Sequence, residues 1–484
     1  MHDKSILSRY PDYEVNIGIE VHVQLTTASK IFCTCSNEIT HEPNRNICQI
    51  CTGQPGVLPV LNKQVIEYAI KAGLATNCSI TQESEFSRKH YFYPDLPKNY
   101  QITQQDYPIC TEGYVTIGLE NGETKNIRLI RIHIEEDAGK NIHAAHSNES
   151  FVDLNRAGTP LLETVTYPDI SSAYEAREYL KALRLIVQYL EICSGNMEDG
   201  AFRADTNISV RKKGSDKLGT KCELKNINSF KFISDAIDYE IDRQITLLES
   251  GQRVKQETRL WDTKERKSVI MRSKEEAADY RYFRDPDLPL IVVSPQEIDA
   301  IKQALPELPY AKFQRLCAQG ATPYEAEILV NDLELAAYYE QAAKHTNSKH
   351  LINWILRDLL SLVKTQKIGL SDCKITPKHL ADLVDLVDKN IINNRAAQEV
   401  FAAMAQTGQE PQVIVKEKGL EQVGTSAELE AIIKEIVDTN PQVVAEYKSG
   451  KDRLWSFFVG QAMQKTKGKG NPQIINELLK KYLA

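Results

Sequence analysis

Two carboxylate-rich runs in the first third of the chain, IRIHIEEDAGK and VDLNRAGTPLLE, contain residue types that could do chemistry. In the first run apolar and polar residues alternate, which is the period of a half-buried strand, so His133 and Glu135 share its polar face. Glu135, Glu136 and Asp137 follow one another with no cation between them. Because adjacent negative charges repel one another, this run favours a bound divalent ion. A solvated strand end followed by a turn at Gly139 explains the run equally well.

A second alternating stretch, YEVNIGIEVHVQL near the N-terminus, presents a Glu and a His two residues apart. Glu20 and His22 share its polar face, opposite the valines and isoleucines. Carboxylates and an imidazole from two strands are ligands suited to Mg²⁺ or Mn²⁺, although imidazole is unusual for Mg²⁺. We therefore predict that Glu20, His22 and Glu135 bind one divalent ion, which requires direct or nearly direct pairing of the two strands. The alternative is that both polar faces are solvent-exposed sheet.

Two close pairs of cysteines, Cys33-Thr-Cys35 and Cys48-Gln-Ile-Cys51, lie in a turn-rich stretch. Four thiolates arranged as two close pairs match a tetrahedral zinc site. Such a site leaves no open coordination position, so the zinc would be structural and would hold a loop that has few apolar residues. Four unrelated buried thiols are the alternative.

A loop punctuated by prolines, SRKHYFYPDLPKNYQ, mixes cations with aromatic residues. Arg88, Lys89 and Lys98 stand among the aromatic side chains between Tyr91 and Tyr100. Phosphates need positive charge and a base needs a stacking plane, so the loop favours a nucleotide. Arg88 and Lys89 are the candidates for contact with its phosphates. An ordinary surface loop is the alternative.

Length and composition limit the class of protein. At 484 residues the chain should form two or three domains, and its 42% of hydrophobic and 26% of charged residues are typical of a soluble globular protein. No apolar run has the length of a membrane span and the N-terminus lacks a signal-peptide core, so a cytoplasmic location is expected. The net charge of -7 requires any contact with nucleic acid to use local basic surface. Ten cysteines, few of them clustered, indicate a reducing compartment.

The elements that would position these residues change in type along the chain. The first ~290 residues contain several polar-faced strands and long helices, which predicts an α+β domain with an antiparallel sheet backed by helices. Beyond Pro295 the pattern is helical. The predicted domains are therefore 1–295, 296–412 and 413–484, the last being a small helical module. Its basic loop, KTKGKGN, could contact phosphates or could simply be solvated.

Several well-known motifs are absent from the sequence: it has no P-loop, no dinucleotide-binding glycine motif, no G-x-S-x-G and no Ser-rich amidase loop. The cysteine pairs and six long segments resemble the B subunit of the bacterial and organellar tRNA-dependent amidotransferase. The segments are NIGIEVHVQL, SRKHYFYPDLPKNYQI, IHIEEDAGK, VDLNRAGTPLLE, EDGAFRADTNIS and FVGQAMQKTKGKGNPQIINELL. The resemblance runs from about Tyr13 to the C-terminus, and its departures, such as Thr164, spare the charged positions.

The resemblance implies a cradle-shaped catalytic domain related in fold to glutamine synthetase, then a helical domain and a tail that binds tRNA. The implied activity is repair of a misacylated tRNA. ATP activates the side-chain carboxylate of Glu-tRNA(Gln), and in many organisms of Asp-tRNA(Asn), to an acyl phosphate that ammonia attacks. The family's glutaminase A subunit makes the ammonia from glutamine, and a small C subunit ties the other two subunits together.

The resemblance also implies roles for individual residues in metal binding and catalysis. Glu20, His22 and Glu135 fall on the family's metal and catalytic positions, with Glu136 as a weaker candidate metal ligand. Lys89 falls in the active-site basic loop, where it would meet the phosphates of ATP. Mg²⁺ would offset charge that builds up on the phosphates, and Lys89 would add a second positive charge. One carboxylate could accept a proton from the reacting amine, and the sequence does not choose among them.

Two other classes of function fit parts of the sequence. A zinc-stabilised RNA-binding module without catalysis would explain the cysteines and the basic tail, but it would leave the polar faces of Glu20 and Glu135 without a role. A stand-alone carboxylate–amine ligase that uses free ammonia or a small amine would share the metal site but would not need the helical tail. A measurable ATPase activity would distinguish the amidotransferase subunit from a non-catalytic RNA-binding module. Dependence on partner subunits and on tRNA would distinguish it from a stand-alone ligase.

Overall fold

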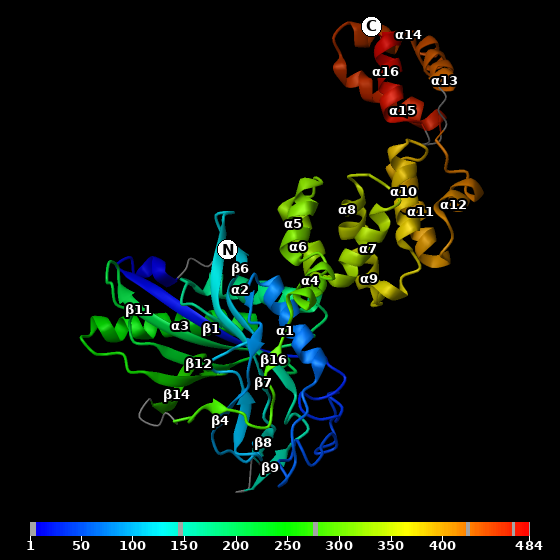
Figure 1. Cartoon of the computed structure of the whole chain (residues 1–484). Helices are drawn as coiled ribbons and strands as arrows, with labels where there is room; N and C mark the ends of the chain where they lie inside the picture. The colour runs from blue at the N-terminus through cyan, green and yellow to red at the C-terminus, as the bar shows by residue number, and fades with distance from the viewer. Residues whose placement is uncertain (1–5, 144–148, 274–278, 423–425, 467–469, 484) are drawn as a thin grey trace. The chain divides into compact units, whose positions relative to one another are not determined.

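The computed structural model describes five stretches of the chain, which are residues 6–143, 149–273, 279–422, 426–466 and 470–483. Two compact units follow one another along the sequence, Met1–Ala311 and Lys312–Ala484 (Figure 1). The first unit contains the sheet and all the predicted metal-site residues, and the second is built from helices. Among the described residues, no helix is both long and apolar enough to span a membrane.

A nine-stranded sheet forms the centre of the first unit. From one edge to the other its strands are β14 (Lys267–Ser273), β13 (Glu257–Asp262), β12 (Cys222–Ile227), β11 (Phe202–Lys212), β1 (Tyr13–Gln24), β10 (Pro160–Thr166), β7 (Thr124–Glu136), β6 (Cys110–Gly118) and β2 (Ser79–Ile80). Neighbouring strands are antiparallel except β12 and β13, which run parallel. Strand β1 lies at the middle of the sheet, so it is paired along both of its sides.

Strand β1 has the strict alternation that its sequence predicts. Its odd-numbered residues from Tyr13 to Val23 are buried, and its even-numbered residues are only partly buried. The buried residues share one hydrophobic core with three helices, α1 (Lys63–Ala75), α2 (Ala173–Tyr189) and α3 (Phe230–Glu249). Because helices cover the apolar side of β1, its even-numbered side chains gather on the opposite, polar face of the sheet.

The two long helices α2 and α3 each begin after a serine that caps the first turn. The hydroxyl of Ser172 accepts a hydrogen bond from the backbone N–H of Glu175 at 3.1 Å, and the hydroxyl of Ser229 accepts one from that of Phe232 at 3.2 Å. Each cap satisfies a backbone donor that the first helical turn leaves unpaired, which typically stabilises the helix by about 1 kcal/mol. The start of each helix is therefore determined locally.

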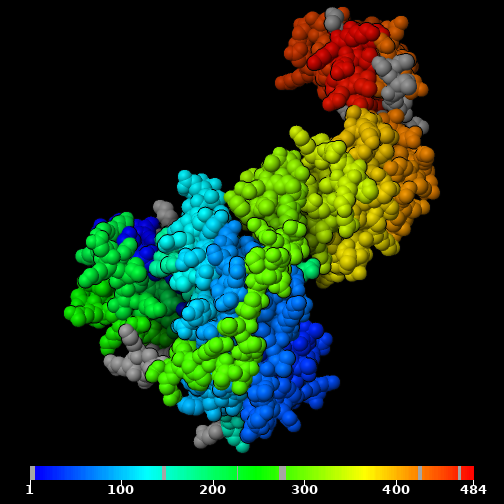
Figure 2. All heavy atoms as spheres, in the orientation of Figure 1, coloured from blue at the N-terminus to red at the C-terminus, as the bar shows by residue number. Residues whose placement is uncertain are grey.

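Smaller sheets contain further strands of the first unit: β15 (Phe283–Arg284) with β4 (Ser87–His90) and β5 (Tyr100–Thr103), β16 (Ile291–Val292) with β3 (Glu83–Ser84), and β8 (Lys140–His143) with β9 (Ser150–Asp153). Figure 2 shows the light-green segment of β15 and β16 lying against the blue segment of their partners. The backbone N–H of Ile102 in β5 donates to the carboxylate of Glu136 at 2.8 Å. Because β4 pairs with β5, the basic loop lies beside the end of β7.

The remaining helices follow the sheet in sequence. They are α4 (Pro295–Gln303), α5 (Pro309–Ala318), α6 (Pro323–Asn331), α7 (Leu333–Ala343), α8 (Leu351–Asn353), α9 (Leu360–Gln366), α10 (Pro377–Asp388), α11 (Asn394–Thr407), α12 (Pro411–Glu417), α13 (Ser426–Thr439), α14 (Pro441–Lys448), α15 (Trp455–Lys465) and α16 (Pro472–Leu483). A π-helical turn joins α8 to α9. The last helices have a core of their own, in which Phe458 and Leu479 are fully buried.

The predicted fold class is confirmed as a mixed α/β region with a mostly antiparallel sheet, followed by helices. The predicted domain boundaries at residues 295 and 412 stay predictions, and so does the relation to glutamine synthetase. Lys467 and Lys469 of the predicted basic loop lie outside the described residues.

Candidate functional site

Four strands bring polar side chains into one row across the polar face of the sheet. His22 of β1 lies opposite Glu163 of β10, which in turn lies opposite His133 of β7. On the other side of β1, Arg203 of β11 lies opposite His22. Directly opposite residues of antiparallel strands have Cβ atoms about 4.5–5.5 Å apart. Arg203, His22, Glu163 and His133 therefore form a continuous row.

Two imidazoles and two carboxylates meet at the centre of this face. The Nε2 atom of His22 lies 3.4 Å from Glu163 Oε2 and 3.4 Å from Glu135 Oε1. The Nε2 atom of His133 lies 3.3 Å from Glu163 Oε2 and 3.7 Å from Glu135 Oε2. His22, Glu135 and Glu163 each offer a ligand atom within 4.8 Å of the other two. We call these three residues the histidine–glutamate group.

The charges of this group depend on one another. Burial disfavours a charged imidazole, but the hydrogen bond to Glu163 and the charges of Glu163 and Glu135 outweigh burial and raise the pKa of His22 to about 9. Against the effect of burial, the same carboxylates also raise the pKa of His133. Burial would raise the pKa of Glu163, but the two imidazoles hold it well below its ordinary value. The two carboxylates therefore require nearby positive charge, which protons on the imidazoles or a divalent cation could supply.

The two polar strands were predicted to pair directly or nearly directly, and the structure has them one strand apart, with β10 between β1 and β7. The structure brings His22 and Glu135 together across this intervening strand, and Glu163 of β10 completes their group. Glu163 was not among the predicted ligands, although it ends one of the two carboxylate-rich runs. Its place in an alternating strand was the signal that could have identified it.

Glu20 belongs to a neighbouring group and not to the histidine–glutamate group. Its carboxylate lies with those of Asp205 and Glu223, and each offers an oxygen within 4.8 Å of the others. Lys225 Nζ lies 2.6 Å from Asp205 and 2.9 Å from Glu223, and Asn207 donates to Glu20 at 3.0 Å. Burial, followed by the charges of nearby carboxylates, raises the pKa of Glu20. The predicted convergence of Glu20, His22 and Glu135 is therefore divided between two groups on the same face.

Glu136 points away from both groups. Its carboxylate accepts hydrogen bonds from Lys98 Nζ and from the backbone N–H of Ile102, on the side of the sheet opposite to Glu135. Consecutive residues of a strand project to opposite faces, so Glu135 and Glu136 cannot serve the same ion from a regular strand. The structure thus separates Glu136 from the other predicted ligands.

The two predicted phosphate-binding cations, Arg88 and Lys89, lie in different surroundings. Burial lowers the pKa of Lys89, but the charges of Glu135, Glu163 and two tyrosines together raise it above its ordinary value, so this ammonium lies near the histidine–glutamate group. Its Nζ atom lies 4.8 Å from the ring centre of Tyr280. Arg88 instead donates to Asp285 at 2.9 Å and to Asp287 at 2.7 Å. Two carboxylates thus hold the guanidinium of Arg88, whereas Lys89 lies next to the site.

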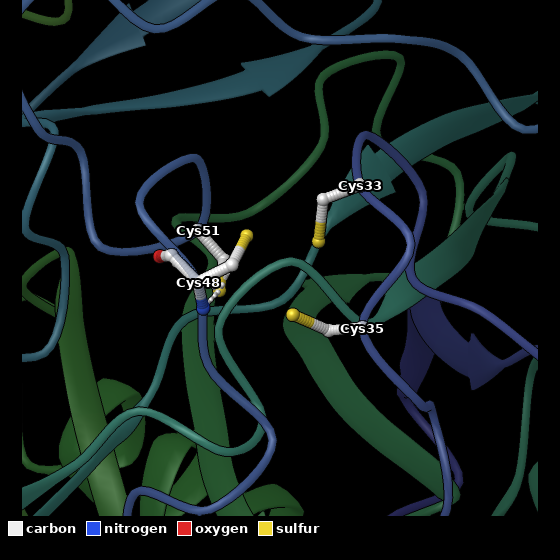
Figure 3. Close-up of side chains that lie close together, drawn as sticks. All are labelled: Cys33, Cys35, Cys48 and Cys51. Carbon is white, nitrogen blue, oxygen red and sulfur yellow. Dashed lines mark hydrogen bonds between the residues drawn. The ribbon is translucent and has the colours of Figure 1, made fainter.

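The four predicted zinc ligands converge. The sulfur atoms of Cys33, Cys35, Cys48 and Cys51 all lie within 4.8 Å of one another, and Figure 3 shows them facing a common space from two segments of the loop. The Cys48 and Cys51 sulfurs are 3.9 Å apart, which is close to the spacing between ligands of a tetrahedral zinc ion. The donor set and its geometry therefore form a possible metal site that suits zinc.

A buried lysine supports the thiolate form of this site. Lys30 has no exposed surface, and its Nζ atom donates to the carbonyl of Asn46 at 2.7 Å and lies 3.7 Å from Cys51 Sγ. The hydrogen bond from Cys33 is the largest of several contributions, the charge of Lys30 among them, that lower the pKa of Cys51 to about 5. Thiolates bind zinc and thiols do not, so Lys30 favours the binding form.

Comparison with known proteins adds two family matches. Residues 15–299 match the model described as the GatB/GatE catalytic domain, and residues 337–483 match the one described as the GatB domain. The first match includes every residue of the histidine–glutamate group and all four cysteines of the loop.

Curated relatives match over nearly the whole chain. The B subunit of the aspartyl/glutamyl-tRNA(Asn/Gln) amidotransferase of Syntrophotalea carbinolica is 52% identical over 473 residues, which cover 97% of this chain and 98% of that protein. The protein of the same name from Myxococcus xanthus is 51% identical over 98% of this chain and 99% of its own length. That of Carboxydothermus hydrogenoformans is 48% identical with the same coverage.

Proposed function

This chain belongs to the family of the B subunit of the aspartyl/glutamyl-tRNA(Asn/Gln) amidotransferase, and we propose that its polar sheet face is where that ligase activates and amidates a carboxylate. A subunit of an amidotransferase works in a complex with other subunits. The observation that carries the proposal is the histidine–glutamate group, because its two carboxylates meet two imidazoles and lie near Lys89. The ligands for a divalent ion thus lie next to Lys89, a cation that could bind phosphate.

The proposed reaction has two steps at one carboxylate. A side-chain oxygen of Glu-tRNA(Gln) or Asp-tRNA(Asn) attacks the γ-phosphorus of ATP, and the bond between that phosphorus and the bridging oxygen breaks to release ADP. Ammonia then attacks the carbonyl carbon of the acyl phosphate, inorganic phosphate leaves, and a proton of the amine passes to a base. The products are Gln-tRNA(Gln) and Asn-tRNA(Asn).

Each group has a part in the first step. His22, Glu135 and Glu163 would hold Mg²⁺, which when bound supplies positive charge to the phosphate oxygens. Their donor atoms fit such an ion because they lie within 4.8 Å of one another and carry a surplus of negative charge. Lys89 would bind the same phosphates as a second positive charge. Glu20 stays a proposed site residue, since it lies on the same face two residues from His22.

The wider organisation of the complex is proposed from the family. A glutaminase A subunit would supply ammonia, and a small C subunit would join that glutaminase to this chain. Zinc on the four cysteines would hold their loop, and the sheet domain would be related in fold to glutamine synthetase. The tail after residue 412 would contribute tRNA affinity, so its truncation should weaken binding and flatten the dependence of that binding on salt.

Co-expression with candidate A and C subunits provides the test. The complex should convert Glu-tRNA(Gln) to Gln-tRNA(Gln) with ATP and glutamine. Glu135→Gln keeps the shape and removes a charge, so it should abolish tRNA-dependent ATP hydrolysis and leave the partner's glutaminase chemistry intact. Glu14→Gln, at the far end of β1, is the matched control and should remain active. A Glu135→Gln complex that activates the carboxylate at the normal rate would remove this site from the mechanism.

The same assay separates the two rival functions. A non-catalytic RNA-binding module would bind tRNA without hydrolysing ATP in response to it. A stand-alone ligase would amidate a carboxylate without partner subunits. The relatives favour neither alternative, because their names describe one subunit of an amidotransferase.

A further inference from the structure

We infer that Arg203 binds the phosphoryl group during its transfer, and that Asp137 is the positioning residue that aims the guanidinium of Arg203. This inference rests on the proposed function, because it assigns one more contact to the ATP-dependent step. It concerns a cation on β11, the strand that pairs with β1 on the side away from β10. Arg203 would thus complete the positive charge around the transferred group.

The register of the sheet places Arg203 at the edge of the histidine–glutamate group. Arg203 lies opposite His22, and Asp205, two residues along the same face, lies opposite Glu20. The side chain of Arg203 is 32% exposed, so part of its guanidinium remains accessible to a ligand above the sheet. Cβ atoms of directly opposite residues on antiparallel strands lie about 4.5–5.5 Å apart, so Arg203 is an immediate neighbour of His22. Arg203 therefore borders the site directly.

A buried carboxylate holds one end of this guanidinium. Asp137 Oδ2 accepts a hydrogen bond from Arg203 Nη2 at 2.9 Å and one from Gln24 Nε2 at 2.9 Å. Arg156 Nε lies 3.5 Å from the same oxygen, while Arg156 donates to the carbonyls of Ala138 and Gly139. Asp137 is only 6% exposed, so water screens its charge little and the guanidiniums of Arg203 and Arg156 are its charged partners. One carboxylate thus faces two guanidiniums, which leaves a net positive charge at this end of the site.

Two other cations of this region, Lys225 and Arg88, have their charge compensated. Lys225 bridges Asp205 and Glu223, and Arg88 is held by two aspartates. For Arg203 the structure shows, among the residues it describes, a hydrogen bond through Nη2 to Asp137 alone. Because a guanidinium carries several N–H donors in a planar fork, one fixed donor leaves others to bind oxygens.

The chemistry of phosphoryl transfer suits such a side chain. As the carboxylate oxygen forms its bond to the γ-phosphorus and the bond to the bridging oxygen breaks, charge is spread over the equatorial and leaving oxygens. An arginine can donate two parallel hydrogen bonds to these oxygens, which a lysine cannot do. An anchored guanidinium needs little reorganisation to make them. Arg203 should therefore stabilise the transition state more than it stabilises bound ATP.

The test compares variants of Arg203 in the complete complex, with tRNA-dependent ATP hydrolysis as the readout. Arg203→Ala should lower kcat at least about 100-fold with a smaller change in the KM for ATP, because an electrostatic contact made in the transition state is lost. Arg203→Lys should restore little activity, whereas added guanidinium ion should partly restore that of Arg203→Ala. Arg211→Ala, on the same face of β11 but eight residues away, is the matched control and should retain kcat. An Arg203→Ala complex within about threefold of wild type would overturn the inference.

Asp137→Asn tests the positioning role through coupling. If Asp137 acts through Arg203, the double variant Asp137→Asn with Arg203→Ala should be no slower than Arg203→Ala alone. Losses that multiply would show that Asp137 acts independently and would overturn its assignment. A wild-type complex without tRNA-dependent ATP hydrolysis would remove the proposed function, and the role of Arg203 with it. A fully active wild type with a fully active Arg203→Ala complex would remove only the role of Arg203.

Discussion

The cysteine loop and the histidine–glutamate group are two predicted metal centres that are built in opposite ways. All four cysteines lie between Cys33 and Cys51, so one short loop brings their sulfur atoms together. The ligands His22, Glu135 and Glu163 are far apart in sequence and meet because three strands lie side by side. We expect the loop to depend on a metal for its fold, whereas the polar face is supported by the hydrophobic core beneath it. Damage to the first should therefore reduce stability, and damage to the second should reduce activity.

After Glu135→Gln, Glu163→Gln should have the largest effect on activity and should sharpen this contrast. It removes one of the two carboxylates that contact both imidazoles, so tRNA-dependent ATP hydrolysis should fall about 1,000-fold. The midpoint of thermal unfolding should stay close to that of wild type, because the core under β10 is unchanged. Activity within tenfold of wild type, in a folded complex, would exclude Glu163 from the site.

Lys89 and Arg88, two neighbouring cations of β4, should show the same contrast between a loss of activity and a loss of stability. Lys89→Met should lower kcat/KM for ATP about 100-fold, since this ammonium lies near the histidine–glutamate group. Arg88→Met should instead destabilise the protein by about 3–5 kcal/mol, because it leaves the buried carboxylate of Asp285 without its partner. Steady-state kinetics and thermal unfolding of both variants provide the measurement. Equal kinetic losses would show that both cations bind the nucleotide.

Glu20→Gln should have a smaller effect than the changes at Glu163 and Lys89. Its group is already partly neutralised by Lys225, so we expect about a tenfold loss of tRNA-dependent ATP hydrolysis. Glu14→Gln on the same face of β1 serves as the control. If Glu20→Gln were as damaging as Glu163→Gln, the two acidic groups would have to act as one centre.

Cys51→Ser should have the smallest effect on the chemistry and a clear effect on the fold. The purified variant should lose its zinc, measured by metal analysis, and the free energy of unfolding should fall by at least about 2 kcal/mol. ATP hydrolysis per folded molecule should stay within about threefold of wild type, because a zinc site closed by four cysteines takes no part in chemistry. Cys317→Ser, at a partly exposed thiol outside the loop, should keep the metal content. A wild-type protein without zinc under reducing conditions would contradict the assignment.

Local sequence determined the elements of this protein. The alternation of β1 identified a half-buried strand with Glu20 and His22 on its polar face, and the structure has that strand and that face. Ser172 and Ser229 cap α2 and α3, so the start of each helix depends on a residue next to it in the sequence. The spacing of the four cysteines was sufficient to predict a common site, because a short loop limits how far apart its residues can lie. The opposite directions of Glu135 and Glu136 also follow from alternation, although Glu136 was kept among the predicted ligands.

Only the tertiary structure decided which polar residues share a group. Strand β10 lies between β1 and β7, so Glu163 of β10 joins His22 and Glu135 in one group. The tertiary structure also paired β1 with β11, which assigned Glu20 to the group of Asp205. Strand order and register result from the packing of whole strands and helices over long sequence separations, so they leave no local pattern along the chain. Alternation shows which face a side chain occupies, and only the assembled sheet shows which side chains it meets there.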